Sequence, residues 1–266
     1  MEKNELNIQM YLICFGTRPE LIKLIPLIQK CKEKNIEFKT LFSGQHENLI
    51  QDFYKYIDKP DYTFTNIMEH GQTLNQLSSK ILLQSNKLFT ENKGIFKSVI
   101  VQGDTTTACT LAISAFHFQI PVIHVEAGLR TNDKYSPFPE EINRRLISQI
   151  ASIHLCPTAL SVDNLKREQI TKGVHLVGNT VVDIYKYIYE NTNPPKNIQN
   201  IIDMNQEYIV VTLHRRENRG EKIYSMWDQL NLLSDNYKFI YITHPSLPRT
   251  TLNNRNIVLL DPQNYE

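Results

Sequence analysis

Short runs of consecutive apolar residues alternate along the chain with longer segments whose apolar positions recur at helical spacing. The runs MYLICF, FKTLFS, SVIVQ, PVIHV and IHLC begin at residues 10, 38, 98, 121 and 153. Helical patterns cover residues 19–34, 47–57, 74–91, 105–118 and 140–150. Strands that are apolar on consecutive residues are buried on both faces, and crossover helices between them make the strands parallel. The pattern predicts a doubly wound α/β domain.

A polar segment with a Pro-Pro pair, NTNPPKNIQNIIDMNQ over residues 191–206, interrupts this alternation. Such composition is typical of an interdomain linker. After it, YIVVTLH, a helix that includes Trp227, KFIYIT and NIVLL repeat the α/β pattern. We therefore expect a first Rossmann-like domain over residues 1–190 and a second over 207–266. The second is roughly half of a typical domain of ~100–150 residues, so we expect it to be incomplete.

Length and charge narrow the classes of function. The chain has 266 residues, 41% of them hydrophobic, and a formal net charge of +1. Because the charge is balanced, the chain lacks the excess of basic residues that is typical of nucleic-acid-binding proteins. The N-terminus is polar and no run approaches the ~18 apolar residues of a membrane span, so we expect a cytoplasmic protein without a membrane anchor. The four cysteines are far apart and lack CxxC spacing, which favours reduced structural thiols.

Three carboxylates follow buried strands or begin helices. Asp104 comes after SVIVQ, Glu126 follows PVIHV, and Glu140 begins the next helical segment. In an open parallel sheet these positions share one edge, where ligands bind. Like charges gathered at one edge repel each other, so packing alone gives no reason to collect them there. We interpret the three as an acid–base site.

Structural alternatives exist for these acids and their neighbours. Asp104 would cap the helix that follows it, a contribution of about 0.5–2 kcal/mol. Glu126 faces either a cleft or a buried partner, for which Arg130 is the obvious candidate. An acid in a helix first turn can be purely structural, and we assign that role to Glu141. His124, on an apolar strand, is expected to be a hydrogen-bonded core residue.

The first strand-to-helix turn, FGTRPELIKLIP, is a candidate anion site. Gly16 lies at the turn, and Pro19 suits the first helical position. Free N–H groups and the positive helix end attract anions, and Arg18 and Lys23 add charge. A plain turn with solvated charges is the alternative. The turn is not a GxGxxG fingerprint, which disfavours a nicotinamide or flavin cofactor. No His/Cys/Asp cluster has metal-ligand spacing, so we expect neither a cofactor nor a metal.

Histidines follow two strands of the second unit. His214 comes after YIVVTL and His244 after KFIYIT. If it faces the first domain, His214 would carry a proton or stabilise a leaving diphosphate. An unremarkable basic loop is the alternative, because Arg215 and Arg216 follow His214 directly.

Several segments together resemble the non-hydrolysing UDP-N-acetylglucosamine 2-epimerases, in the same order. They are FGTRPELIKLIP, SGQHENL, QGDTTTACTLAISAF, PVIHVEAGLRTNDKYSPFPEEINRR, VGNTVVD, VTLHRREN and LLDPQNYE. The resemblance implies a glycosyltransferase-B-like fold of two domains that hold a nucleotide sugar between them. It also implies interconversion of UDP-N-acetylglucosamine and UDP-N-acetylmannosamine. Members of the family remove the C2 proton, eliminate UDP, reprotonate the other face and add UDP back.

The resemblance implies roles for individual residues. Those that match the family's acid–base groups are Asp104, Glu126, Glu140 and His214. Those that match or lie near positions beside the UDP are Arg18, Lys23 and His244. Gln45 and His46 resemble part of the regulatory nucleotide-sugar site of bacterial members, with Glu47 where a basic residue is usual. Family members are commonly dimers, so the resemblance also implies a homodimer.

Family members continue past the DPQ-Tyr segment with a Ser-Gly-Gly loop that cradles the diphosphate and a final helix that braces the first domain. The sequence ends at Glu266, so the resemblance implies a C-terminally truncated member with a weakened hold on UDP. Two alternatives to an active epimerase therefore stay open. One is an inactive homologue that serves as a binding or interaction module. The other is a hydrolysing epimerase that releases N-acetylmannosamine and UDP.

Overall fold

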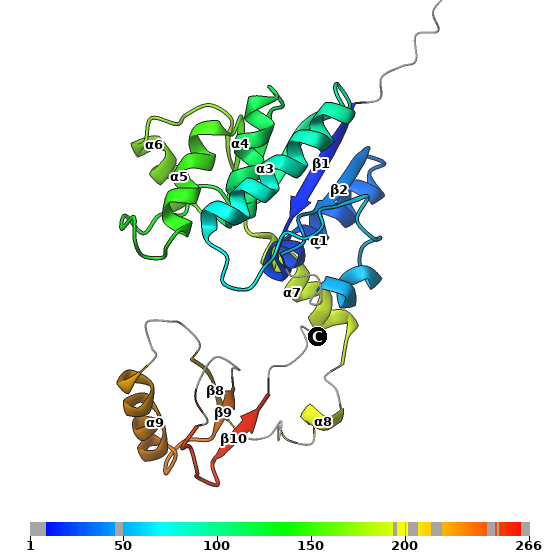
Figure 1. Ribbon diagram of the computed structural model, residues 1–266. Coiled ribbons are helices and arrows are strands. Elements are labelled where there is room, and N and C mark those ends of the chain that lie inside the picture. Colours follow the sequence, from blue (N-terminus) through cyan, green and yellow to red (C-terminus); the bar gives the residue numbers. More distant parts are fainter. Residues whose placement is uncertain are drawn as a thin grey trace, which may run out of the picture. The chain divides into compact units, whose positions relative to one another are not determined.

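The computed structural model describes residues 9–45, 50–193, 196–199, 201, 207–213, 220–243, 248 and 250–261. The chain divides into two compact units, Met1–Tyr187 and Ile188–Glu266. Figure 1 shows the elements of both, coloured along the sequence.

The first unit is built on a seven-stranded sheet of parallel strands in the order β3-β2-β1-β4-β5-β6-β7. Its strands are β1 (Met10–Phe15), β2 (Phe38–Phe42), β3 (Tyr62–Thr63), β4 (Phe96–Gln102), β5 (Val122–Val125), β6 (Ile153–Cys156) and β7 (Val174–Leu176). Its helices are α1 (Arg18–Glu33), the 3-10 helix η1 (Gln51–Lys55), α3 (Leu74–Glu91), α4 (Thr106–His117), α5 (Glu140–Ile150), α6 (Ala159–Arg167) and α7 (Thr180–Asn191), which continues into the second unit. The strand order reverses between β1 and β4, and ligands bind at such a switch point. The predicted α/β class is therefore confirmed.

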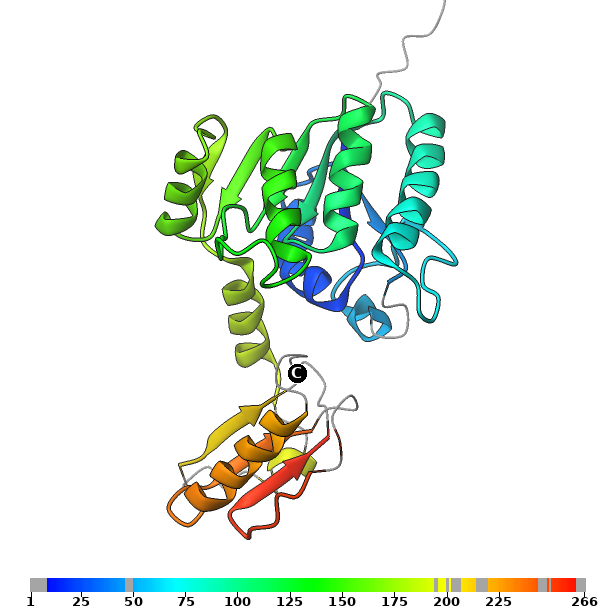
Figure 2. The same ribbon diagram turned by 60° about the vertical axis from the view of Figure 1, so that its left-hand side comes forward.

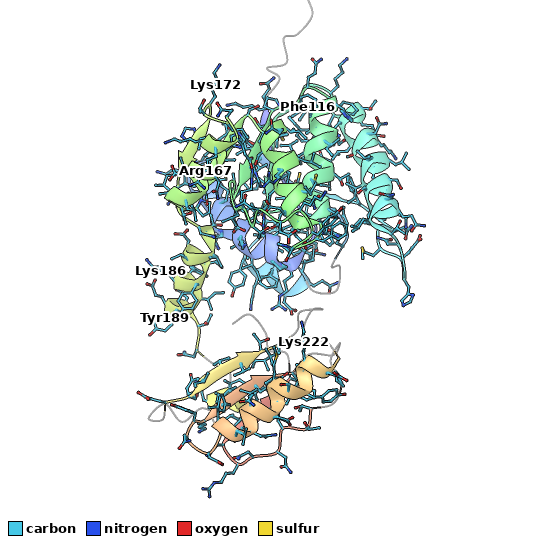
Figure 3. The ribbon with its side chains drawn as sticks, turned by 90° about the vertical axis from the view of Figure 1, so that its left-hand side faces the viewer. Phe116, Arg167, Lys172, Lys186, Tyr189 and Lys222 are labelled. Atoms are coloured by element: carbon cyan, nitrogen blue, oxygen red, sulfur yellow. The ribbon has the colours of Figure 1, made fainter. Side chains whose placement is uncertain are left out.

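Helices cover both faces of this sheet. Helices α3, α4 and α5 pack side by side over one face, and α1 lies on the other (Figure 2). Because both faces are covered, Val99, Ile100 and Val101 are buried in succession along β4, which explains the consecutive apolar residues seen in the sequence. Figure 3 shows Phe116 of α4 and Arg167 of α6 on the outside of the unit.

Four elements of the first unit differ from the sequence-based prediction. The helix expected over residues 47–57 is a 3-10 helix at Gln51–Lys55 among the described residues. Helix α6 and strands β3 and β7 were not predicted. Helix α6 is short and buries only Ser161 and Leu165, and β7 lies at the sheet edge with mostly exposed side chains. Elements with so little apolar surface leave a weak hydrophobic pattern.

The second unit has a three-stranded parallel sheet in the order β10-β9-β8. Its elements are α8 (Lys196–Gln199), β8 (Ile209–Thr212), α9 (Glu221–Leu233), β9 (Phe239–Ile242) and β10 (Ile257–Leu260). Trp227 of α9 is buried against Ile223, Tyr241 and Leu252, and its Nε1 donates to Tyr241 Oη at 3.0 Å. The predicted helix around Trp227 is confirmed.

Two other predictions concern the chain as a whole. All four cysteines lie in the described part of the chain as buried, free thiols, in agreement with structural cysteines. Among the described residues, no helix is long and apolar enough to cross a membrane.

His124 is a core residue, as predicted. Its side chain is fully buried on β5, and Nε2 lies 2.7 Å from the carbonyl oxygen of Gly103. Burial lowers the pKa of His124 to about 4, although the bond to Gly103 opposes this. The ring is therefore neutral in the folded protein at neutral pH.

We expect His124 to make the first unit acid-sensitive. Between pH ~6.5 and ~4 the unfolded chain binds a proton at this ring and the folded chain does not, so stability falls as pH falls, by about 3 kcal/mol in total. Above pH ~6.5 both states are neutral and the contribution is fully present. Urea unfolding of wild type and His124→Gln at pH 7 and pH 4.5, followed by circular dichroism, measures it. The variant should lose less stability between the two pH values; parallel losses would contradict the assignment.

Candidate active site

Glu126 leaves β5 with a φ of 66°, a left-handed backbone conformation that is uncommon outside glycine and often marks functional sites. Its carboxylate accepts from Lys23 Nζ at 2.9 Å and 2.7 Å, one bond to each oxygen. Asn179 Nδ2 donates to Glu126 Oε2 at 3.2 Å. The Glu126 side chain is 10% exposed. Glu126 is thus a sheltered carboxylate held by a cation and an amide.

The predicted partner of Glu126 is wrong, because Arg130 binds Glu168 instead. Arg130 Nε and Nη2 each donate to one oxygen of Glu168 at 2.7 Å. Nη2 also donates to Ser148 Oγ at 3.0 Å. Arg130 is thus bonded to Ser148 of α5 and to Glu168, the residue that follows α6.

Asp104 does not cap the helix that follows it. Thr105 is the cap, and its Oγ1 accepts from Ala108 N at 3.0 Å. Asp104 Oδ2 instead accepts from Arg144 Nε at 2.8 Å and lies 2.5 Å from Arg144 Nη2. Asn143 Nδ2 donates to the carbonyl oxygen of Asp104 at 2.8 Å. Two neighbouring side chains of α5 therefore fix both the carboxylate and the backbone of Asp104.

Glu140 and Glu141 play different parts at the start of α5. Glu141 is fully buried and accepts from Thr131 N at 2.9 Å and Asn132 N at 3.3 Å. Burial alone would raise the pKa of Glu141, but these bonds and Arg145 outweigh burial and lower it. This is the structural role expected for Glu141. Glu140 Oε2, in contrast, is buried and has no hydrogen-bond partner within the described part of the chain.

The N–H groups of Gly16 and Thr17 in the turn after β1 are hydrogen-bonded within the protein. Glu20, in the first turn of α1, accepts from Gly16 N at 3.1 Å and Thr17 N at 2.7 Å through Oε2. An internal carboxylate thus takes two N–H groups of the turn, and the anion site beside Arg18 and Lys23 stays a prediction. Lys23 is paired with Glu126 rather than solvated. The Arg18 guanidinium lies 5.4 Å from the ring centroid of Phe53.

Gln45 lies at the same edge of the sheet, after β2. Its Oε1 accepts from Thr107 Oγ1 at 2.5 Å, and Thr107 Oγ1 is 2.9 Å from Ser43 Oγ. A Cβ on Gly16 would lie 2.3 Å from Ser43 Oγ, so only glycine lets the three strand exits approach this closely. The predicted residues His46, His214 and His244 lie outside the described residues.

Contacts connect the first-unit candidates into one network. Helix α1 touches two strand exits: Lys23 binds Glu126 after β5, and Glu20 Oε1 accepts from Thr105 Oγ1, after β4, at 2.7 Å. Helix α5 then binds Asp104 through Arg144, one turn after Glu140. We found no group of three or more His, Cys, Asp or Glu able to hold a metal in the part of the chain that is described.

Sequence reasoning missed Glu20, Asn179 and Arg144. Glu20 carries a recognisable signal, since Thr17 and Glu20 form the T-x-x-E capping box of α1. Asn179 precedes α7, and its Oδ1 accepts from Val181 N at 3.1 Å, as a helix-capping Asn does. Arg144 has no local signal, because its partner Asp104 lies 40 positions earlier.

Comparisons with known proteins agree on one family. The family model described as UDP-N-acetylglucosamine 2-epimerase matches residues 29–266. A Campylobacter jejuni UDP-N-acetylglucosamine 2-epimerase is 36% identical over 97% of this chain and 73% of its own length. A Thermotoga maritima relative is 37% identical over 87% of this chain, which spans 61% of that relative. The crystal structure of the Neisseria meningitidis epimerase bound to UDP-GlcNAc superposes with a TM-score of 0.86 at 33% identity, over 97% of this chain and 73% of that one.

Proposed function

This chain belongs to the UDP-N-acetylglucosamine 2-epimerase family, and from that premise we propose that it converts UDP-N-acetylglucosamine to UDP-N-acetylmannosamine by eliminating and re-adding UDP. The observation that carries the proposal is the first-unit network: Lys23 and Glu20 of α1 bind Glu126 and Thr105, and Arg144 of α5, one turn after Glu140, binds Asp104. The Neisseria relative binds UDP-GlcNAc, which supports this nucleotide sugar as substrate.

Epimerisation at C2 needs one proton carrier on each face of the sugar ring. A base must offer an oxygen that can accept the proton. Both oxygens of Glu126 are bound by Lys23, and Oδ2 of Asp104 is bound by Arg144. Glu140 Oε2 is unpartnered within the described residues. We therefore assign proton transfer on one face to Glu140.

Asp104 and Glu126, whose carboxylates are bound by cations, have roles different from that of Glu140. Arg144 orients Asp104 through Oδ2, and this arrangement supports Asp104 as the proton carrier of the other face. Lys23 and Asn179 hold Glu126 in one orientation, so that Glu126 can accept a hydrogen bond from a hydroxyl or amide of the substrate. For Arg18 and His244 we propose the contacts to UDP that the family resemblance implies, and for His214 the role of the family's catalytic histidine.

Proton NMR in D2O tests the proposal with the purified protein and UDP-N-acetylglucosamine. The expected product is UDP-N-acetylmannosamine with deuterium at C2, because elimination exchanges that proton with solvent. Free N-acetylmannosamine and UDP would instead identify a hydrolysing epimerase. Calorimetric binding of UDP without exchange or product would identify a binding module, and both outcomes would reject the proposal.

A further inference from the structure

Glu20 is a buried carboxylate that the proposed chemistry does not use. Its residue exposure is 2%, and among the described residues no Lys or Arg pairs with it. Burial raises the pKa of Glu20, while hydrogen bonds from Thr105, Thr17 and Gly16 oppose the rise. Burying an unpaired carboxylate costs several kcal/mol unless hydrogen bonds satisfy its oxygens. Helix capping alone therefore does not explain why the carboxylate of Glu20 is buried.

The four donors to Glu20 come from two different strand exits. Oε2 accepts from Gly16 N, Thr17 N and Thr17 Oγ1, at 3.1, 2.7 and 2.7 Å. Oε1 accepts from Thr105 Oγ1 at 2.7 Å, from a residue 85 positions away. An ordinary capping box satisfies only its own helix terminus. This one also ties the turn after β1 to the turn after β4.

Both threonines bonded to Glu20 are adjacent to candidate site residues. Thr17 precedes Arg18, and Thr105 follows Asp104. One turn further along α1, Lys23 binds Glu126. A displacement of either turn would change the separation of Asp104 from the Lys23–Glu126 pair.

We propose that Glu20 is a positioning residue of the active site: its carboxylate fixes the turn that carries Asp104 against the turn that carries Arg18. Glu20 touches no reacting atom and acts through Thr105 and Thr17. The kinetic part of this inference rests on the proposed epimerase function. A misplacement of about 1 Å at a catalytic group can reduce the rate about 10²-fold.

Glu20→Gln is the sharpest variant, because it keeps the size of the side chain but has one oxygen instead of two. Its single oxygen can accept at the β1 turn or from Thr105. With the oxygen at the β1 turn, the NH2 group can only donate to Thr105 Oγ1, which replaces the charge-assisted bond by a weaker neutral one. We expect kcat to fall about 10²-fold with little change in KM, since no group that contacts the substrate is removed. If the variant only folded less well, the amount of active enzyme would fall, but the pH dependence of kcat for the folded molecules would not change. A positioning defect changes that profile, because Asp104 sits in a different environment.

Helix α3 provides a matched control. Thr73 and Gln76 form a capping box of the same type there, with Gln76 Oε1 accepting from Thr73 N at 2.7 Å. Gln76→Ala removes that box without touching either strand-exit turn, so kcat should match wild type. If Glu20→Gln folds poorly, Thr17→Val removes one donor to Oε2 and leaves the backbone bond in place. A milder loss of kcat is then expected.

Amide hydrogen exchange gives a readout that does not depend on activity. In Glu20→Gln, exchange should accelerate at Gly16 and Thr17 and also at Ala108, whose N–H donates to Thr105 Oγ1. Faster exchange confined to Gly16 and Thr17, with kcat unchanged, would reduce Glu20 to a local cap and overturn the inference. If wild type shows no C2 exchange, the proposed function fails, while the Ala108 result still decides whether Glu20 ties the two turns.

Discussion

Glu140→Gln is expected to lower kcat for C2 epimerisation by about 10²–10⁴-fold, the contribution of a positioned proton carrier. The amide has nearly the size and shape of the carboxylate, but it cannot take a proton from carbon at neutral pH. Deuterium incorporation at C2 should fall with kcat, because both measure the same proton transfer. Binding of UDP should persist, since the nucleotide does not depend on this side chain.

Stability separates this chemical effect from misfolding. Glu140 Oε2 forms no hydrogen bond within the described residues, so the substitution breaks none at that atom. The negative charge in the first turn of α5 contributes about 0.3–1 kcal/mol, and a loss of that order is the most we expect. Glu33→Gln is the matched control: it removes an exposed carboxylate of α1 that pairs with Lys30, and its kcat should equal that of wild type. A Glu140→Gln enzyme with wild-type kcat would remove Glu140 from the chemistry.

The positions of the candidate carboxylates could be predicted from the sequence because they depend on strand ends alone. Consecutive apolar residues marked β4 and β5, and the first polar residues after them are at the carboxyl edge of the sheet. Asp104 and Glu126 therefore fell at the correct edge without any knowledge of packing. The fold class followed from the same periodicity.

The partners of those carboxylates could not be predicted in this way. Arg130 was the nearest cation to Glu126 in sequence, but Lys23, 103 positions away, binds it. Which cation reaches a strand exit depends on how α1 lies across the sheet and where the chain turns after Gly128. The local spacing of apolar residues determines neither of these features. The same reason hid the bond between Glu20 and Thr105.

Glu168→Ala is expected to cause a large loss of stability in the first unit. Its partner, Arg130, has a side chain only 1% exposed, and Glu168 is 21% exposed. The bonds from Arg130 lower the pKa of Glu168, so the pair is ionic at neutral pH. Removing one partner leaves the guanidinium buried without a counterion, which typically costs about 3–5 kcal/mol. By comparison, Asp58→Ala breaks the exposed pair with Lys32 and should cost less than about 1 kcal/mol.

The double variant Arg130→Met/Glu168→Leu separates two quantities. One is the net contribution of the ion pair to the free energy of unfolding, and the other is the loss caused by removing only one partner. Apolar replacement of both partners of a buried pair is often neutral, so the double variant should recover most of the stability lost in Glu168→Ala. The single tryptophan of the chain, Trp227, is in the second unit. Its fluorescence therefore reports unfolding of that unit, while circular dichroism reports both. In urea, Glu168→Ala should shift the dichroism transition and leave the fluorescence transition in place if the units unfold independently. A double variant no more stable than Glu168→Ala would mean that Arg130 stabilises the unit through its contacts with Ser148 and the loop after Gly128, rather than through its charge.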